Sequence, residues 1–449
     1  MKLANRDIFL AGAGNLYSEE KKYIGYWVWL AFWVTQIIFL LENAATASES
    51  LPSRALALAC NGNQAEILNI QSEFPGSTLR DVRVQKFRGR PGKSYHILGL
   101  SEGGELRISR LFPNGKLRRI SIEHYERAYN GRFKPISAAI GNGSCVEVEK
   151  RSIISDFNGR PVRLQIIRSG EKSNVLFNPA VPKGLDPGGI LVAVIDTGIN
   201  YLLPDFSKRL ARDRNGDLLG YDFWDDDKRP FDVDFSRSPF FPLHHGTAVT
   251  SIILREAPTA RIAPYRFPRP QMERMSDVIA HAVKSGARII NLAMGSKRKK
   301  DWITFEIAAR AHPELLFIVS AGNDGVDIDE MPLYPAALNI ANMITVTSAD
   351  NFGRLATGAN WGKASVDIMV PGERVSVVDH RGVEGKASGS SFSVPRVVAL
   401  AARWLRKFPG WTVQDLKSAI LSRARPAPSQ AEDLIKYGWI PDPTDDYLP

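Results

Sequence analysis

From about residue 185 onward, short and uninterrupted apolar runs alternate with stretches of helical spacing. The runs include "ILVAVIDTG", "ARIINLAMG", "LFIVSAGN" and "MITVTSA", and stretches such as "SDVIAHAVKSG" and "WITFEIAARAHPE" lie between them. Strands that are apolar along their whole length are buried on both faces, which is typical of parallel sheets covered by helices. The pattern predicts an α/β fold with a doubly wound, mostly parallel sheet and helices on both of its faces.

Upstream of this region, from about residue 50 to 175, apolar and polar positions alternate with a period of two. Segments such as "SYHILGL" and "GRPVRLQII" predict half-buried strands, and the Asn-Gly pair in "FPNGKL" predicts a hairpin turn. The Pro- and Gly-rich stretch "NPAVPKGLDPGG" then separates the two textures. We therefore expect a smaller β-rich N-terminal domain over 48–178, a linker over 179–189 and the α/β domain over 190–449.

Residues 23–41, "YIGYWVWLAFWVTQIIFLL", contain no charge and come directly after Lys21 and Lys22. Such a segment enters a membrane, either as a signal sequence or as a retained anchor, and the basic flank places the C-terminal remainder of the chain outside the cytoplasm. Its length favours an anchor, whereas the small residues Ala45 and Ala47 have the form of a cleavage site and favour removal of 1–47. We expect export across the cytoplasmic membrane, with membrane association through 23–41 if it is retained.

Charge adds one further class of partner to consider. The 449-residue chain is 44% hydrophobic with a formal net charge of +10, and 80–134 holds fourteen Lys and Arg against five acids. A basic segment is compatible with nucleic acid or anionic lipid, but no nucleic-acid motif accompanies it. The Gly-Lys-Ser of "RGRPGKSY" lacks the earlier glycine of a phosphate-binding loop. We expect a solvated basic face and no nucleic-acid partner.

The chain contains two cysteines, Cys60 and Cys145, which bracket this basic segment. In an oxidising compartment an isolated pair usually forms a disulfide, although two buried thiols are the alternative. The bridge would close a loop that constrains the unfolded chain by about 4 to 5 kcal/mol on the loop-entropy model. We predict a disulfide that stabilises the N-terminal domain.

Four residue types with complementary chemistry come after the predicted strands or begin the predicted helices: Asp196 in "VAVIDTG", His245 in "HHGTAV", Asn323 in "SAGNDG" and Ser391 in "GSSFSVP". Each alone is more simply a turn or capping residue. Together they supply a nucleophile, its base, the carboxylate that orients the base, and an amide donor for an oxyanion. Such groups gather at the carboxyl ends of parallel strands.

In this chain order, the motifs resemble those of the subtilisin-like serine proteases over about 185–440. The resemblance implies Asp196, His245 and Ser391 as catalytic triad and Asn323 as oxyanion donor. "INLAMGS" is similar to the family strand that pairs with substrate backbone, and "VSAGNDG" is similar to the segment of the oxyanion asparagine. Together these resemblances imply substrate binding by Ala293, Met294, Gly295, Ala321 and Gly322. An endopeptidase acting on polypeptide through an acyl-enzyme is expected, as a monomer, with neighbouring Ser388, Ser390 and Ser393 as turn, motif and helix-start residues.

The sequence also departs from the family pattern. His244 replaces the glycine before the catalytic histidine, Ala248 replaces a second histidine, and Ser390 replaces a threonine. One alternative is a Ser-Glu-Asp carboxyl protease, which has the same fold and a similar serine motif. Such a protease would lack the histidine of "HHGTAV", and the presence of that histidine argues against this alternative. The remaining alternative is a catalytically weak or inactive protease-like binding protein at the cell envelope, although no triad member is missing.

No cofactor is expected to be required, and no metal ligand is assigned. Acidic clusters such as "DFWDDDKRPFDVD" are of a composition that suits structural calcium, but their spacing fits no recognised ligand pattern. The basic run "SKRKKD" directly follows the segment expected to bind substrate. A solvated loop is its simplest interpretation.

Overall fold

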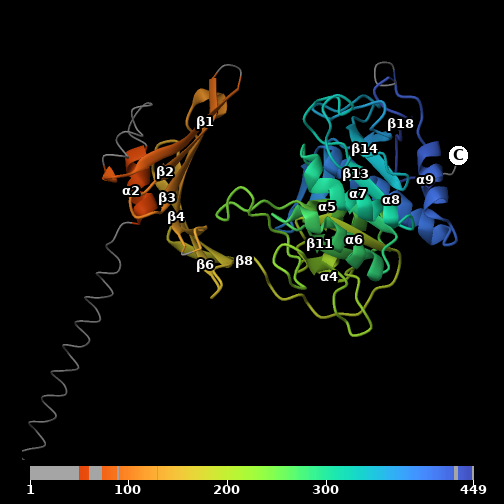
Figure 1. Cartoon of the computed structure of the whole chain (residues 1–449), viewed down its shortest axis with the longest axis horizontal. Coiled ribbons are helices and arrows are strands. Elements are labelled where there is room, and N and C mark those ends of the chain that lie inside the picture. Colours follow the sequence, from red (N-terminus) through yellow and green to blue (C-terminus); the bar gives the residue numbers. More distant parts are fainter. Residues whose placement is uncertain (1–49, 60–72, 88–89, 129, 429–432, 447–449) are drawn as a thin grey trace, which may run out of the picture. The chain divides into compact units, whose positions relative to one another are not determined.

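A computed structural model describes residues 50–446, apart from 60–72, 88–89, 129 and 429–432. The chain divides into two compact units, Met1–Lys150 and Arg151–Pro449 (Figure 1). The apolar segment 23–41 and Cys60 lie outside the described residues, so the membrane segment and the pairing of Cys60 with Cys145 stay predictions. Within the described part, no helix combines the length and apolar character that spanning a membrane requires, and no cysteine is free.

The first unit is built on an antiparallel sheet whose strands are arranged in sequence order from β1. The predicted hairpin is present: β3 and β4 pair antiparallel around a tight turn in which Asn114 and Gly115 adopt positive φ. A helix that the sequence analysis did not predict, α2, packs Ala55 and Leu56 against apolar residues of the sheet such as Ile120. The elements are α2 (Leu51–Ala59), β1 (Thr78–Phe87), β2 (Arg90–Gly99), β3 (Glu105–Leu111), β4 (Arg119–Arg127) and β5 (Phe133–Asn142).

Strand β6 (Glu147–Ser155) crosses the division between the units. The second unit then contains the antiparallel hairpin of β7 (Pro161–Arg168) and β8 (Glu171–Leu176), and after it the α/β region.

That region holds an eight-stranded sheet in the order β10-β11-β9-β12-β13-β14-β15-β18, whose neighbouring strands all pair in parallel. The strands are β9 (Leu191–Asp196), β10 (Tyr221–Asp222), β11 (Arg261–Arg266), β12 (Ile289–Leu292), β13 (Leu316–Ser320), β14 (Met343–Ala349), β15 (Ile368–Pro371) and β18 (Gly438–Trp439). A separate antiparallel hairpin joins β16 (Val375–Val378) to β17 (Glu384–Ala387).

Helices cover both faces of this sheet, as predicted. Alternate residues of β9 enter two different cores: Ile195 packs in the same core as Val278 of α6, whereas Val194 packs with Ile253 of α5 and Val394 of α8. Because side chains alternate across a strand, one apolar run supplies both cores. The helices are α4 (Pro204–Ser207), α5 (Gly246–Glu256), α6 (Met275–Lys284), α7 (Ile303–Ala311), α8 (Ser390–Lys407) and α9 (Val413–Ser422).

Candidate active site

The predicted site residues lie where strands end or helices begin. Asp196 is the last residue of β9, and Asn323 lies three residues beyond the end of β13. His245 occupies the N-cap position of α5, and Ser391 is the second residue of α8. Because β9, β12 and β13 are neighbours running in parallel, their carboxyl ends meet at one edge of the sheet, where ligands bind in open α/β folds.

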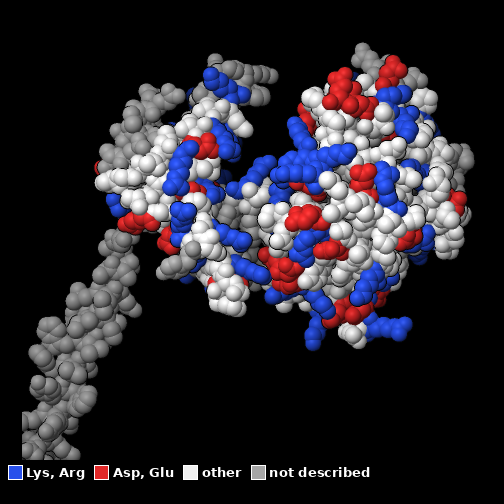
Figure 2. Space-filling view, viewed as in Figure 1, with Lys and Arg blue, Asp and Glu red and all other residues white. Residues whose placement is uncertain are grey.

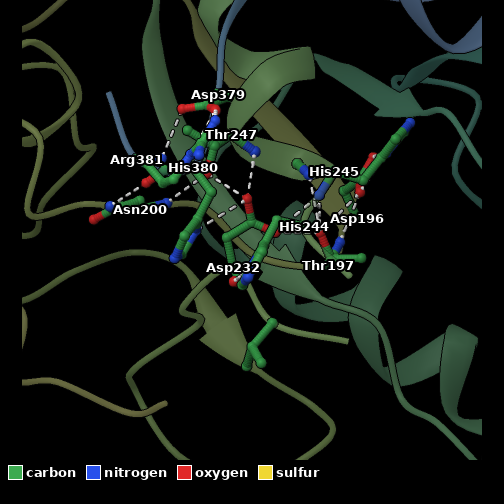
Figure 3. Close-up of polar contacts among 12 residues, drawn as sticks. Asp196, Thr197, Asn200, Asp232, His244, His245, Thr247, Asp379, His380 and Arg381 are labelled. Atoms are coloured by element: carbon green, nitrogen blue, oxygen red, sulfur yellow. Dashed lines mark hydrogen bonds and ion pairs between the residues drawn. The ribbon is translucent and has the colours of Figure 1, made fainter. Parts of the chain in front are cut away.

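Asp196 and His245 are in direct contact. His245 Nδ1 lies 2.8 Å from Asp196 Oδ1 and 2.9 Å from its Oδ2 (Figure 3). A carboxylate only accepts hydrogen bonds, so Nδ1 carries the proton and Nε2 is left with a lone pair. The carboxylate is buried, while about a third of the imidazole is exposed (3% and 32%). This tautomer is the one that a general base acting through Nε2 requires.

Electrostatics favour the charged form of this histidine. Burial alone would lower the pKa of His245, but the negative charge of Asp196 and its hydrogen bond raise it, and the net shift is upward. Asp232 contributes in the same direction. The imidazolium that forms when a base accepts a proton is therefore stabilised at this position.

A second carboxylate, Asp232, lies behind the histidine and was not predicted from the sequence. It is fully buried, and its Oδ1 accepts from Thr197 Oγ1 at 2.5 Å and from the backbone N–H of His245 at 3.1 Å. Its Oδ2 accepts from Thr247 N at 3.0 Å and from the Thr247 hydroxyl (Figure 3). One carboxylate thus ties the turn after Asp196 to the first turn of α5.

Two further histidines adjoin Asp232. The rings of His244 and His380 stack with centroids 3.7 Å apart, and His244 Nδ1 donates to the Asp232 carbonyl oxygen at 2.6 Å. His380 Nδ1 lies 3.6 Å from Asp232 Oδ2. Burial alone would raise the pKa of Asp232, but His380, His244 and the hydrogen bond from Thr197 lower it on balance.

This trio is also the one cluster in the described part of the chain whose ligand atoms, all within 4.8 Å, suit a metal ion. Both Asp232 oxygens already accept two hydrogen bonds from protein donors. Coordination by Asp232 would have to break some of these bonds. We therefore interpret the cluster as one that positions His245 through its backbone N–H, and we assign no metal to it.

Ser391 approaches the end of β12. Its Oγ donates to the carbonyl oxygen of Ala293 at 3.3 Å, and the ring of the next residue, Phe392, lies 5.8 Å from that of His245. The hydroxyl thus points to the segment expected to bind substrate, and the residue that follows it lies close to the histidine. Rotation about χ1 turns such a hydroxyl from one acceptor to another without movement of the backbone.

Asn323 is anchored through its carbonyl end. Its Oδ1 accepts from the Ser390 backbone N–H at 2.8 Å and from the Ser390 hydroxyl at 3.1 Å. Ser390 is fully buried and also contacts Ser320 Oγ at 2.7 Å. Because the oxygen is held in this way, the Nδ2 group of the exposed Asn323 is left to donate beside the start of α8.

The five predicted substrate-binding residues form two short segments beside Ser391. Ala293 to Gly295 continue from β12 and become exposed at Gly295, and Ala321 to Gly322 continue from β13. Gly322 has a φ of 93°, and a Cβ there would come within 2.6 Å of Asn360 Nδ2. Glycine is required at that position.

From the sequence, Asp232 is only one of the acids in "DFWDDDKRPFDVD", the cluster considered for calcium, and its role beside His245 was not predicted. Thr197 and Thr247, which bind it, belong to the "DTG" and "HGT" motifs, so their presence was visible although their shared partner was not. Asp232 itself lies in an irregular segment with no periodicity, and His380 reaches the cluster from the β16–β17 hairpin.

Comparison with known proteins identifies the family. The model of the Subtilase family matches residues 188–439. The chain belongs to the subtilase family. The chain is similar to the thermophilic serine proteinase of Bacillus sp. strain AK1, with 30% identity over 47% of this chain and 51% of that protein. Alkaline serine exoprotease A of Vibrio alginolyticus is 26% identical over 57% of this chain and 45% of that protein.

The subtilase thus spans about half the length of these two curated relatives. Among solved structures, the chain is similar to a cold-adapted subtilisin-like serine proteinase, with 22% identity and a TM-score of 0.47. The similarity covers 58% of this chain and 90% of the chain of that structure. The subtilase match falls wholly within the second unit.

Proposed function

We propose that this subtilase is a serine endopeptidase that hydrolyses peptide bonds through an acyl-enzyme. The contact between His245 Nδ1 and Asp196 carries the proposal, because it leaves Nε2 as a base at the helix start beside the Ser391 region. The membership of the subtilase family supports a polypeptide substrate.

In the proposed mechanism, the Ser391 hydroxyl turns from Ala293 toward His245 and attacks the scissile carbonyl carbon. His245 Nε2 accepts the hydroxyl proton and then delivers it to the leaving amine. Asp196 stabilises the imidazolium. The acyl-enzyme is released when water, deprotonated by the same histidine, attacks the ester, and Ser391 regains its proton.

Two donors adjoin the place where the oxyanion forms. Asn323 Nδ2 is one, because its carbonyl end is already bound to Ser390. The Ser391 backbone N–H, among the first amides of α8, is the second, since the N–H groups of a first helical turn have no partner within the helix. The substrate backbone pairs with Ala293 to Gly295 as an added strand.

Replacement of the nucleophile tests the proposal. Ser391→Ala should leave the fold intact and reduce kcat on an unfolded polypeptide by about 10⁶. Ser388→Ala is the matched control, because the Ser388 hydroxyl only accepts from the Arg374 backbone N–H at 2.9 Å. The parent and the control should react with a fluorophosphonate probe, and Ser391→Ala should not. A parent that is inert to the probe and to unfolded polypeptide would point to an inactive binding protein.

The proposal extends to location and processing. A segment like 23–41 favours export, with the second unit outside the cytoplasm, and either cleavage after Ala47 or retention as an anchor. N-terminal sequencing of the mature protein distinguishes these outcomes and shows whether residues 48–178 are removed as a pro-region. Sedimentation of the same preparation tests the expected monomer, and calorimetry with calcium tests the metal question.

A further inference from the structure

A pocket of about 470 Å³ lies directly beside the segment expected to bind substrate. Met294 and Gly295 form part of its wall, and the apolar side chains of Met272 and Trp302 line it as well. Two guanidinium groups, those of Arg269 and Arg298, share the lining with one carboxylate, that of Asp301.

The side chains that line this pocket carry a net positive charge. Arg298 is paired with Asp301, whose Oδ2 lies 2.8 Å from the guanidinium. Arg269 is half-buried and packs over the Phe267 ring at 5.2 Å, and it forms no ion pair with any residue that the structure describes. A positive charge beside apolar walls favours an occupant that combines an aliphatic stem with a carboxylate.

The basic run that follows the pocket-lining residues Gly295 and Ser296 adds further positive charge next to the pocket. Lys297, Lys299 and Lys300 are exposed. Lys297 has a carboxylate, Asp324, 3.8 Å away, and Lys299 lies 6.0 Å over the Tyr334 ring. Figure 2 shows a group of Lys and Arg side chains on one face of this unit, with Asp and Glu side chains also present on that face. From its sequence this run is expected to be a solvated loop. Because it lies beside the segment expected to bind substrate, it also adds positive charge there.

We propose that this pocket binds an acidic side chain of the substrate and makes acidic polypeptides the preferred substrate class. The proposal rests on the function proposed above. A strand advances about 3.3 Å per residue, and Ser391 contacts Ala293, while Met294 and Gly295 line the pocket. Met294 and Gly295 are one and two residues beyond Ala293, or about 3 to 7 Å along a strand, so the bound side chain belongs to a substrate residue within a few positions of the scissile bond.

Peptide binding to Ser391→Ala tests this without turnover. One fluorescent peptide is made with Glu, Gln or Lys at each of four positions on either side of the scissile bond. At one position, Glu should bind about tenfold more tightly than Gln, with Lys weakest, because a partly buried charged contact exceeds a surface ion pair. The preference should shrink as salt rises.

Arg269→Gln should bring the Glu/Gln ratio at that position close to one. Arg354→Gln, at an exposed arginine paired with Asp350, should keep the full ratio. Equal affinity for Glu and Gln at every position, or a ratio unaffected by Arg269→Gln, overturns the proposal. A Glu preference in binding together with a parent that never cleaves would retain the pocket and reject the proposed peptidase activity.

A second, independent observation concerns Leu333 and bears on the substrate residue whose carbonyl group is attacked. The side chain of Leu333 is buried and reaches both predicted substrate segments: its Cδ2 lies 2.5 Å from where a Cβ of Gly322 would be and 3.3 Å from that of Gly295. Ser391 contacts Ala293 at one side, and Ser390 contacts Gly322 at the other. A substrate strand paired with Ala293 to Gly295, as proposed above, would direct the side chain of its attacked residue between these segments.

We infer that Leu333 partly fills this space and restricts the attacked residue to a small side chain. Peptides that differ only there, with Ala, Leu or Phe, should give a kcat/KM for Ala about tenfold or more above that for Phe, since a methylene-scale misfit is worth roughly 10 to 200-fold. Leu333→Ala should raise the Phe/Ala ratio at least tenfold.

The ratio is measured within one preparation, so it does not depend on the fraction of enzyme that is folded. Leu333→Val, which removes one methylene, provides a smaller change in the same direction if the alanine variant does not fold. Efficient cleavage after Phe by the parent, or an unchanged ratio in both variants, overturns the inference.

Discussion

Asp232 offers the sharpest test of how the site is held together. In Asp232→Asn, one oxygen still accepts two hydrogen bonds, but an NH₂ group replaces the other and faces two donors. Hydrogen bonds to charged groups are worth about 1.5 to 3 kcal/mol each, so two losses amount to about 3 to 6 kcal/mol. Removal of a buried charge and rotation of a threonine hydroxyl offset part of this. We expect a loss of about 2 to 4 kcal/mol.

The assay is urea unfolding in the Ser391→Ala background, which prevents self-cleavage. Asp205→Asn is the control, because that side chain is 93% exposed and its replacement should change the unfolding free energy by less than about 0.5 kcal/mol. In otherwise unmodified enzyme, Asp232→Asn should lower kcat more than it changes KM, since the carboxylate holds the His245 backbone N–H.

The pH dependence gives a second check. The folded-state pKa of Asp232 is lowered, so the stability contributed by its carboxylate is present above the unfolded value of about 3.9 and is lost as pH falls through the folded value. The difference between Asp232→Asn and its parent should therefore be constant near neutral pH and shrink in acid. An unfolding free energy that matches the control at neutral pH would refute the argument.

Three further variants probe other contacts. Asn323→Ala should lower kcat by about 10²–10³ with little change in KM, because its Nδ2 meets charge only in the transition state, and an effect confined to KM would make it a substrate-binding residue. In the Ser391→Ala background, Asp196→Asn should lower the pKa of His245 seen by NMR, so that the imidazole loses its proton at lower pH, and an unmoved titration would contradict the assigned cause. The double variant Cys60→Ser/Cys145→Ser should still react with fluorophosphonate once folded, and two free thiols in the non-reduced exported protein would rule the bridge out.

The α/β fold was predictable because its strands are buried on both faces. The run "LVAVID" contributes to two cores at once, so it is apolar throughout and stands out in the sequence. Helix α2 escaped prediction because its nine residues carry too short a pattern to separate helix from strand. Its place is fixed by packing of Leu56 against Ile120.

The residues of the site also fall into two groups: those that the sequence made predictable and those that it did not. Asp196, His245, Asn323 and Ser391 stand in short motifs whose order carries the resemblance. The role of Asp232 could not be predicted, because the acidic cluster in which it stands suggests calcium binding and not a contact with His245. Its role arises from donors on two separate motifs that meet only in the folded chain. Leu333 is similar: an ordinary apolar residue in the sequence becomes a candidate determinant of specificity because it lies between two glycines.

Two of the three departures from the family pattern have physical explanations in the same contacts. Ser390 keeps the hydroxyl that a threonine would supply, and that hydroxyl contacts the Gly322 carbonyl oxygen at 3.1 Å and Asn323 Oδ1 at 3.1 Å. His244 supplies a ring that stacks on His380 and a donor to the Asp232 carbonyl oxygen. Ala248 takes part in none of the contacts of Asp232 described above. Since the backbone N–H of His245 depends on Asp232 and not on position 248, the base stays oriented despite all three replacements.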